Sequence, residues 1–372
     1  MRAPIAYFVL TILLISAHLD ALGSPGSDVY PEPTIIDTSI VADPYSFAGL
    51  ASYYNAVQFL LVDSHEVQPA SQDGVVKTLK KNEWLVAAGR FNARVFKAPG
   101  LRYDISDGEL RIHDITPLHA PASLDRVVLK SELQQIAPEL DGVRYAHLWF
   151  WLAGLSRLTE SSLLALRSHT SIAWGVTIIL FAFLLKIILL PVSVVSARLQ
   201  RKTDLVTSEL APKLADIKSK FRGEEAHQRI MAAHKEAGVT PFYTLKPMLG
   251  TLIQIPILIA VFNALGEMPQ LQTSSLLWIG SLSYPDAVAT LPFSPPLLGP
   301  NVSVLPVLMA CTMLLASKGP AKKRSAISGI NYGYHLFTFA VFLLLYPFPA
   351  GMVLYWSTNN LFQFFERTLL ER

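Results

Sequence analysis

The sequence predicts a mostly α-helical, polytopic membrane protein with a small β-rich extracytoplasmic domain. Its 372 residues are 51% hydrophobic and only 16% charged, whereas soluble domains are about 25% charged. The apolar run 172–195 is long enough to cross a bilayer, and five further apolar runs can be placed. Lys and Arg gather in two of the loops between these runs, and a long polar segment precedes most of the runs.

Composition and motifs also exclude several functional classes. The net charge of +3 is too small to indicate a nucleic-acid partner. Cys311 is the single cysteine, so the sequence offers neither a disulfide framework nor a Cys-based metal site. It contains no Walker A loop and no GxGxxG, GxSxG or HExxH motif. We therefore expect no cofactor, no metal and no enzymatic activity.

The first element is a signal anchor over residues 1–23. The apolar run Pro4–Ser16 follows Arg2, and Ala21-Leu-Gly23 is a possible cleavage site. A removed signal peptide is therefore the alternative, and we favour the uncleaved anchor.

Residues 24–128 are predicted to form a small extracytoplasmic domain with a linker. Residues 24–45 are rich in Pro, Ser and Asp, as linkers are. The segment Leu101–Ile112 alternates apolar and polar residues around Asp107-Gly108, which predicts a β-hairpin with a two-residue turn. Val75–Phe96 also has strand character.

Residues 129–170 turn to a helical pattern. The cluster Leu148-Trp-Phe-Trp-Leu152, followed by Leu155 and Leu158, indicates an amphipathic helix at the bilayer surface. Ordinary packing beneath the small domain is the alternative.

Residues 171–367 are predicted to form a helical core with a cytoplasmic helical hairpin over 196–240. The five expected spans are 172–195, 247–265, 302–316, 335–346 and 351–365. The hairpin would pair Arg198–Phe221 with Glu224–Ala237 across Arg222-Gly223. Its basic residues could be a solvated face or could dock a partner; the candidates for docking are Lys213, Lys218, Lys220 and Arg222.

Loop charges predict the orientation. The loop 196–246 carries ten Lys and Arg against six Asp and Glu, and 318–330 carries four basic residues and no acid. The loop 267–301 contains Glu267 and Asp286 but no Lys or Arg. The positive-inside rule places the first two loops in the cytoplasm. Residues 24–170 are then outside, and both termini are inside.

Lys186 is the most informative residue, because it interrupts the uncharged run Ile172–Val195 near its middle. A charge at mid-membrane costs about 2.5–3.5 kcal/mol on insertion scales and tends to face a polar cavity. Snorkelling toward the headgroups is the alternative. The apolar spans supply no Asp or Glu to neutralise Lys186. We therefore expect a hydrated cavity around this residue and not a closed ion pair.

Other polar residues share helix faces in the predicted spans, and this is typical either of contacts between helices or of a polar groove. Ser193 lies seven residues after Lys186. Asn263 falls on a different face of its span from its polar neighbours. The candidate groove residues are Lys186, Ser193, Thr251, Gln254, Trp356, Asn360 and Gln363.

Several motifs occur together in this order. They are Trp174-Gly-Val-Thr-Ile-Ile with Lys186 and Leu190-Pro191, Leu210-Ala-Pro-Lys-Leu-Ala-Asp-Ile-Lys218, Lys235-Glu-Ala-Gly-Val-Thr-Pro241, Leu252-Ile-Gln-Ile-Pro-Ile257, and Phe348-Pro-Ala-Gly-Met-Val-Leu-Tyr-Trp356 with Asn359-Asn360. On these motifs, 129–367 resembles the YidC/Oxa/Alb family of membrane protein insertases, and its lead-in is similar to Gram-negative members.

The resemblance implies a five-helix insertase core around a hydrophilic groove that opens to the cytoplasm and the lipid. Family members usually place an arginine in this groove, and Lys186 stands at the matching position. The implied function is ATP-independent insertion and folding of nascent membrane proteins in the bacterial inner membrane, alone or with the Sec translocon, and with the ribosome as a further partner.

Two other functional classes remain as alternatives. A small-solute or anion transporter could use Lys186 as a binding site, but it would usually show internal repeats. An intramembrane hydrolase could pair Lys186 with Ser193, but seven helical residues separate them by about 10 Å.

Overall fold

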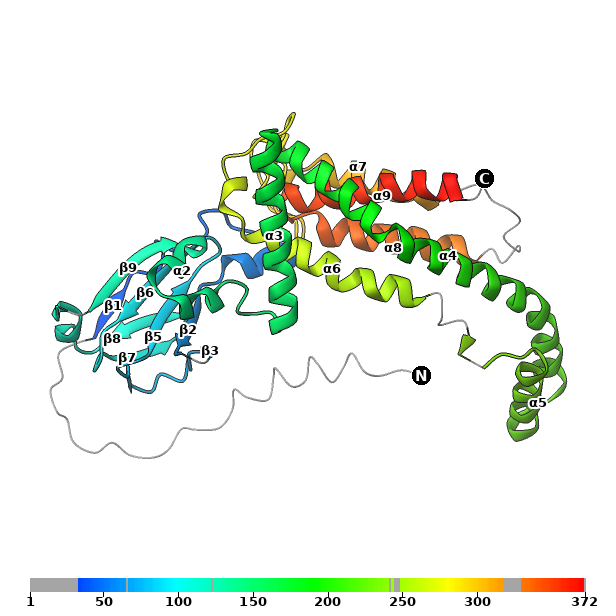
Figure 1. The fold of residues 1–372 in the computed structure, drawn as a ribbon, viewed down its shortest axis with the longest axis horizontal. Helices are drawn as coiled ribbons and strands as arrows, with labels where there is room; N and C mark the ends of the chain where they lie inside the picture. Colours follow the sequence, from blue (N-terminus) through cyan, green and yellow to red (C-terminus); the bar gives the residue numbers. More distant parts are fainter. Residues whose placement is uncertain are drawn as a thin grey trace.

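In a computed structural model, a β-rich domain lies at one end of a bundle of helices and a helical hairpin extends from the other (Figure 1). We call these the domain end and the hairpin end. The structure describes residues 33–64, 66–121, 123–240, 242–243, 248–317 and 329–370. The predicted signal anchor over 1–23, the start of the linker and most of the basic loop 318–330 lie outside these ranges.

The β-rich domain contains two antiparallel sheets. The four-stranded sheet has the order β1-β8-β7-β4, and the five-stranded sheet has the order β3-β2-β5-β6-β9. The strands are β1 (Thr34–Ile36), β2 (Gln58–Val62), β3 (Val67–Pro69), β4 (Lys77–Thr78), β5 (Trp84–Ala88), β6 (Asn92–Lys97), β7 (Arg102–Ser106), β8 (Glu109–Ile112) and β9 (Leu124–Leu129).

The predicted hairpin over 101–112 is confirmed by the pairing of β7 with β8. Asp107 and Gly108 turn between these strands with φ of 53° and 77°, the positive values that a tight two-residue turn requires. The β-rich character of the N-terminal region is thus as the sequence predicted.

The five-stranded sheet is covered on both faces. One face packs against the four-stranded sheet through Phe59, Leu85 and Phe96. The other packs against short helical turns through Val86 and Leu133. All five residues of β5 are buried, which explains their continuous apolar sequence. The short turns are η1 (Gly49–Asn55), η2 (Thr116–His119), η3 (Lys130–Glu132), α2 (Leu133–Ile136) and η4 (Pro138–Val143).

The remaining residues form helices and one external loop. The helices are α3 (Phe150–Thr170), α4 (Trp174–Lys220), α5 (Gly223–Glu236), α6 (Met248–Glu267), α7 (Leu305–Ser317), α8 (Gly329–Leu345) and α9 (Ala350–Leu370). The loop between α6 and α7 contains η6 (Pro269–Leu271) and the paired strands β10 (Ala289–Thr290) and β11 (Asn301–Val302).

Among the described residues, α4 is the one helix that is long and apolar enough by itself to cross a bilayer. Shorter apolar helices cover Leu252–Glu267, Leu305–Leu315 and Gly333–Leu345. Helix α3 runs across the domain end of the bundle, whereas α4, α6, α8 and α9 run along its length (Figure 1).

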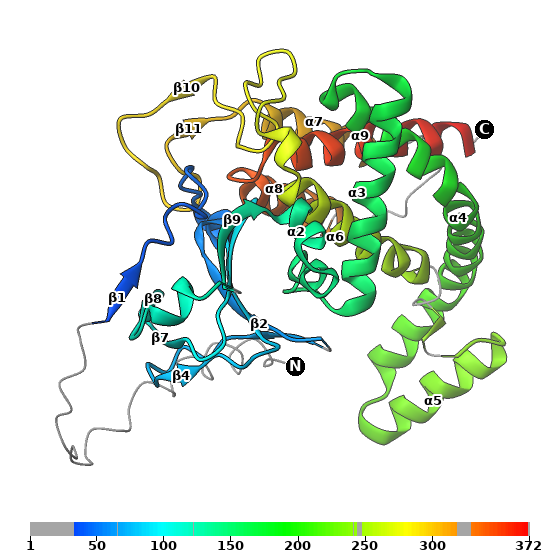
Figure 2. The same ribbon diagram turned by 60° about the vertical axis from the view of Figure 1, so that its left-hand side comes forward.

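Helix α4 continues without a break from the apolar run into the charged arm of the predicted hairpin. It contains Pro191 and Pro212, and Figure 2 shows it as a curved rod, as expected because each proline removes a backbone hydrogen bond. The chain reverses at Gly223, whose φ is 62°. Leu210, Ala233 and Tyr243 then form a small core that holds α5 against α4.

The main helical core is concentrated at the domain end. Ile178 and Ala182 of α4 pack there with Val261 and Leu265 of α6 and with the first turns of α9. Beyond Ala182, no residue of α4 from 183 to 209 is buried. The helices are therefore tightly packed at the domain end and leave much more side-chain surface uncovered toward the hairpin end.

Candidate functional site: two ionic centres of the helical core

Lys186 lies on α4 just beyond the packed core, and it has an acidic partner. Its Nζ is 2.8 Å from Glu366 Oε2 on α9, and the two side chains are only 12% and 10% exposed. The expectation that Lys186 has no ion-pair partner is therefore wrong. The predicted final span stopped at Phe365, one residue short of Glu366, whereas α9 continues to Leu370.

A periodic signal in the sequence could have found this pair. The ring of Phe183 lies 5.2 Å from that of Phe362. Three residues after Phe183 comes Lys186, and four residues after Phe362 comes Glu366. Both steps return to the same helix face. An aromatic contact followed one turn later by opposite charges indicates two helices that lie side by side.

Polar groups without a partner accompany this pair on α9. Among the described residues, Trp356 Nε1, Asn360 Nδ2 and Glu366 Oε1 are buried and have no hydrogen-bond partner. Asn360 is only 8% exposed, and Trp356 packs against Phe262 of α6 with ring centroids 5.8 Å apart. Since buried polar groups are nearly always paired, these atoms mark a place where a polar partner would be stabilising.

The other groove candidates lie on the same three helices. Ser193 is on α4, Gln254 is on α6 and Gln363 is on α9, each half-buried. None of the described hydrogen bonds or ion pairs connects these three residues to Lys186. Thr251 belongs to α6, but its side chain lies outside the description.

The docking candidates of the hairpin are solvent-exposed. Lys213 approaches Glu236 at 3.5 Å, and Lys220 approaches Asp216 at 2.8 Å, with every one of these side chains more than half exposed. Lys218 and Arg222 are also exposed. Such pairs are screened by solvent and contribute little to stability, so the basic charge remains available to a partner.

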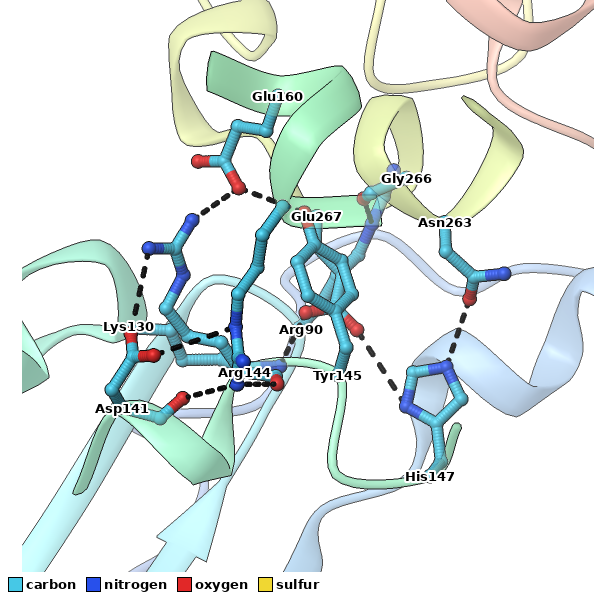
Figure 3. Close-up of polar contacts among 11 residues, drawn as sticks. Arg90, Lys130, Asp141, Arg144, Tyr145, His147, Glu160, Asn263, Gly266 and Glu267 are labelled. Carbon is cyan, nitrogen blue, oxygen red and sulfur yellow. Dashed lines mark hydrogen bonds and ion pairs between the residues drawn. The ribbon is translucent and has the colours of Figure 1, made fainter. Parts of the chain in front are cut away.

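A second ionic centre lies at the domain end and was not foreseen in the sequence (Figure 3). Arg90, between β5 and β6, enters the helical core. It donates hydrogen bonds to Asp43 Oδ2 at 3.0 Å, to the carbonyl oxygen of Gly266 at 2.6 Å and to that of Ser283 at 2.9 Å. The side chains of Arg90 and Asp43 are both 0% exposed.

Aromatic rings complete the environment of Arg90. Its guanidinium lies 4.3 Å from the ring centroid of Tyr54 and 4.5 Å from that of Phe91, distances at which cation–π attraction contributes. Gly266 leaves room for the Tyr54 ring, because a Cβ at this position would collide with the Tyr54 hydroxyl. The guanidinium also lies at the C-terminal end of α6, the negative end of the helix dipole.

Further ion pairs tie this junction to α3 and α6 (Figure 3). Lys130 is 2.7 Å from Glu267, and His147 Nε2 is 2.8 Å from Asn263 Oδ1. Glu160 of α3 accepts hydrogen bonds from Arg144 and from the Tyr145 hydroxyl. Burial, reinforced by the Glu160 carboxylate, raises the pKa of Tyr145 above its usual range, so the phenol stays a neutral donor.

These features define a class of protein. It is an apolar helical protein with a β-rich domain packed against one end of the helical bundle, a charged hairpin at the other end and a buried, paired lysine between the two ends. Residues 165–372 match the family model described as the 60Kd inner membrane protein. This is more than half of the chain, and the chain belongs to that family of inner membrane proteins. The family predicted from its motifs is confirmed.

Relatives agree with this assignment. The membrane protein insertase YidC of Chloroherpeton thalassium is 32% identical over 199 residues, which cover 53% of this chain and 32% of that protein. The YidC of Janthinobacterium sp. (strain Marseille) is 25% identical over 338 residues, covering 85% of this chain and 56% of that protein. The chain thus spans about a third of the length of the first of these relatives.

One solved structure is also similar. It is described as a crystal structure of an active YidC insertase with the first transmembrane domain resolved. Its sequence is 18% identical, the TM-score is 0.39, and the match covers 82% of each chain.

Proposed function

We propose that this protein is a membrane protein insertase that receives nascent chains in a hydrophilic groove between α4, α6 and α9. The observation that carries the proposal is the buried Lys186–Glu366 pair, just beyond the tightly packed domain end, together with unpartnered donors on the same helix α9. Charged and amide groups inside an apolar helical core are energetically expensive, so their presence there supports a functional pathway. The groove would comprise Lys186, Ser193, Thr251, Gln254, Trp356, Asn360 and Gln363.

The proposed topology has five spans formed by α4, α6, α7, α8 and α9, and a signal anchor over 1–23. Residues 24–170 would lie in the periplasm, with the hairpin and the C-terminus in the cytoplasm. The positive-inside rule supports this orientation. Helix α3 would lie at the periplasmic surface of the inner membrane. Its orientation across the bundle and the 88% exposed Phe150 at its start support that placement.

The proposed mechanism needs no ATP. A groove that holds water from the cytoplasmic side shortens the apolar distance that a polar client segment must cross. Lys186 attracts carboxylates of that segment in a low-dielectric setting. The apolar part of the client then moves into lipid, where burial of its surface contributes about 25 cal/mol per Å². The hairpin would contact the ribosome or the Sec translocon.

Crosslinking of nascent chains tests this function directly. We expect a photoreactive probe at Gln254 to capture ribosome-bound membrane proteins, and a probe at the exposed Tyr53 of η1 to capture far fewer. A transporter of small solutes would capture no translating chains at either position, and that result would reject the proposal.

Substitution of the cation tests its electrostatic role in a strain depleted of its own insertase. Lys186→Arg should retain insertion of clients with acidic segments, because the charge remains. Lys186→Gln should impair insertion of clients with acidic segments more than that of other clients. Lys186→Glu should impair the acidic clients further, since it also places a second carboxylate beside Glu366. Full rescue by Lys186→Gln would contradict the role assigned to the cation.

A further inference from the structure

We propose that Glu366 is an internal counter-ion that pairs with Lys186 until a client carboxylate displaces it. This exchange would determine which clients the groove accepts. The inference rests on the proposed insertase function. It assigns a specificity role to a residue that lies outside the predicted groove set and one position beyond the predicted last span.

Lys186 and Glu366 form a close and largely buried pair. The 2.8 Å contact joins two side chains that are 12% and 10% exposed, so both charges have given up most of their hydration. Removing hydration from a single charge in a low-dielectric region is very unfavourable. Pairing with Glu366 therefore explains how Lys186 resides between apolar helices when no client is present.

The hydrogen-bonding capacity of the pair is incompletely satisfied. An ionised carboxylate accepts several hydrogen bonds, yet Glu366 Oε1 is buried and has no partner among the described residues. Lys186 has three donors, and its described polar contact is with Glu366 alone. A pair that lacks further hydrogen bonds has few interactions to oppose exchange.

Helix α9 also carries unpartnered hydrogen-bond donors. The unpartnered atoms of Trp356 and Asn360 are both N–H donors. They precede Glu366 on α9 by ten and six residues, which at 1.5 Å per residue is about 15 and 9 Å. Unpartnered donors on the helix that carries Glu366 suit an acceptor-rich ligand, namely a polar client segment with carbonyl oxygens and carboxylates.

Exchange conserves the charge balance of the site. A client carboxylate replaces the Glu366 carboxylate on Lys186, so one ion pair is broken as another is formed. Glu366 lies near the hairpin end of α9, four residues before Leu370, where its released carboxylate can take up water. When the client leaves, Glu366 pairs with Lys186 again. A neutral client has no group with which to displace Glu366.

Competition makes a definite prediction for Glu366→Gln. The apparent affinity of a ligand equals its intrinsic affinity multiplied by the fraction of sites that are free to bind it. Removing the resident carboxylate should raise capture of an acidic client by roughly fivefold and leave a neutral client nearly unchanged. The measured quantity is the ratio of acidic to neutral client crosslinked through a probe at Gln254. The two clients differ only by Asp→Asn changes in the segment to be translocated.

Two further variants make the test specific. Lys186→Gln combined with Glu366→Gln removes both charges and should bring the ratio close to one. Glu209→Gln removes an exposed carboxylate from the hairpin part of α4 and should leave the ratio at the wild-type value. Because both clients are tested on the same preparation of membranes, partial misfolding of a variant lowers both yields and cancels in the ratio.

The outcomes separate this inference from the function on which it rests. A ratio that stays unchanged or falls in Glu366→Gln overturns the competition and leaves Glu366 as a fixed neutralising group. If wild-type protein captures neither client, the insertase function itself fails, and this inference fails with it.

Discussion

The Arg90–Asp43 and Lys186–Glu366 ion pairs are both buried, and their surroundings differ. Arg90 and Asp43 are 0% exposed, and the guanidinium is also held by two carbonyl oxygens and by aromatic rings. Lys186 and Glu366 are slightly exposed, and one carboxylate oxygen lacks a partner among the described residues. The environment of Arg90 therefore suits a permanent contact between the β-rich domain and the helices. The environment of Lys186 suits a group that can change partners.

The largest effect on stability is expected from breaking the Arg90–Asp43 pair. Arg90→Met leaves Asp43 as a buried, unpaired charge, so we expect the free energy of unfolding to fall by about 3–5 kcal/mol. Denaturant unfolding in detergent micelles measures this change, and limited proteolysis reports whether the β-rich domain separates from the helices.

Arg94 provides the matched control for Arg90. It lies on β6 of the same sheet and pairs with Asp125 at 2.8 Å, but these side chains are 21% and 30% exposed. Arg94→Met should therefore lower the free energy of unfolding by only about 1 kcal/mol or less. Equal losses from the two substitutions would mean that Arg90 has no special place at the junction.

Removing both partners sharpens the comparison. Lys186→Met alone leaves Glu366 unpaired and should lower the free energy of unfolding by about 2–4 kcal/mol, whereas adding Glu366→Leu should restore most of it. Arg90→Met with Asp43→Leu should recover much less, because the carbonyl oxygens of Gly266 and Ser283 still lose their donor. Thermal unfolding in one detergent compares all four variants. Equal recovery at both sites would contradict the proposed difference.

These two regions also show what the sequence could predict. Local patterns were sufficient for the β-hairpin at Asp107-Gly108, because the turn and the alternation both occur within twelve residues. The helical character of the C-terminal half and the family followed from apolar runs and from the order of the motifs.

Contacts between distant residues were not predictable in the same way. The partner of Lys186 is 180 positions away, and it lay just outside the expected end of the last span. Arg90 looks like an ordinary turn residue between two strands. Its acceptors are at Asp43, Gly266 and Ser283, and only the folded arrangement of the β-rich domain and the helices brings them together. Local periodicity carries no information about the partners of Arg90, and for Lys186 it offers only the matching spacing from an aromatic residue to a charge on α4 and α9.

A smaller effect is expected at the edge of the junction. Tyr145→Phe removes the hydrogen bond to Glu160, and we expect a loss of about 1–2 kcal/mol near neutral pH. Burial raises the pKa of Tyr145 in the folded state. The wild-type protein should therefore lose stability from this group as pH rises above about 10, the unfolded value.

The phenylalanine variant has no such proton to lose. The stability difference between wild type and Tyr145→Phe should therefore narrow above pH 10, as measured by thermal unfolding across the alkaline range. A constant difference at all pH values would show that the Tyr145 proton is not held more tightly in the folded state.

The smallest effect on stability is expected at the hairpin, where the comparison changes from buried to exposed pairs. Lys213→Ala with Lys220→Ala should change the free energy of unfolding by less than about 1 kcal/mol, since both pairs are exposed. If the hairpin docks a partner, the same variant should nevertheless weaken cosedimentation with translating ribosomes, and more so as salt is lowered. Lys80→Ala with Lys81→Ala, on the exposed surface of the β-rich domain, removes the same charge. Equal loss of ribosome binding in both variants would assign the effect to net charge, and no loss in either would leave the hairpin lysines as a solvated face.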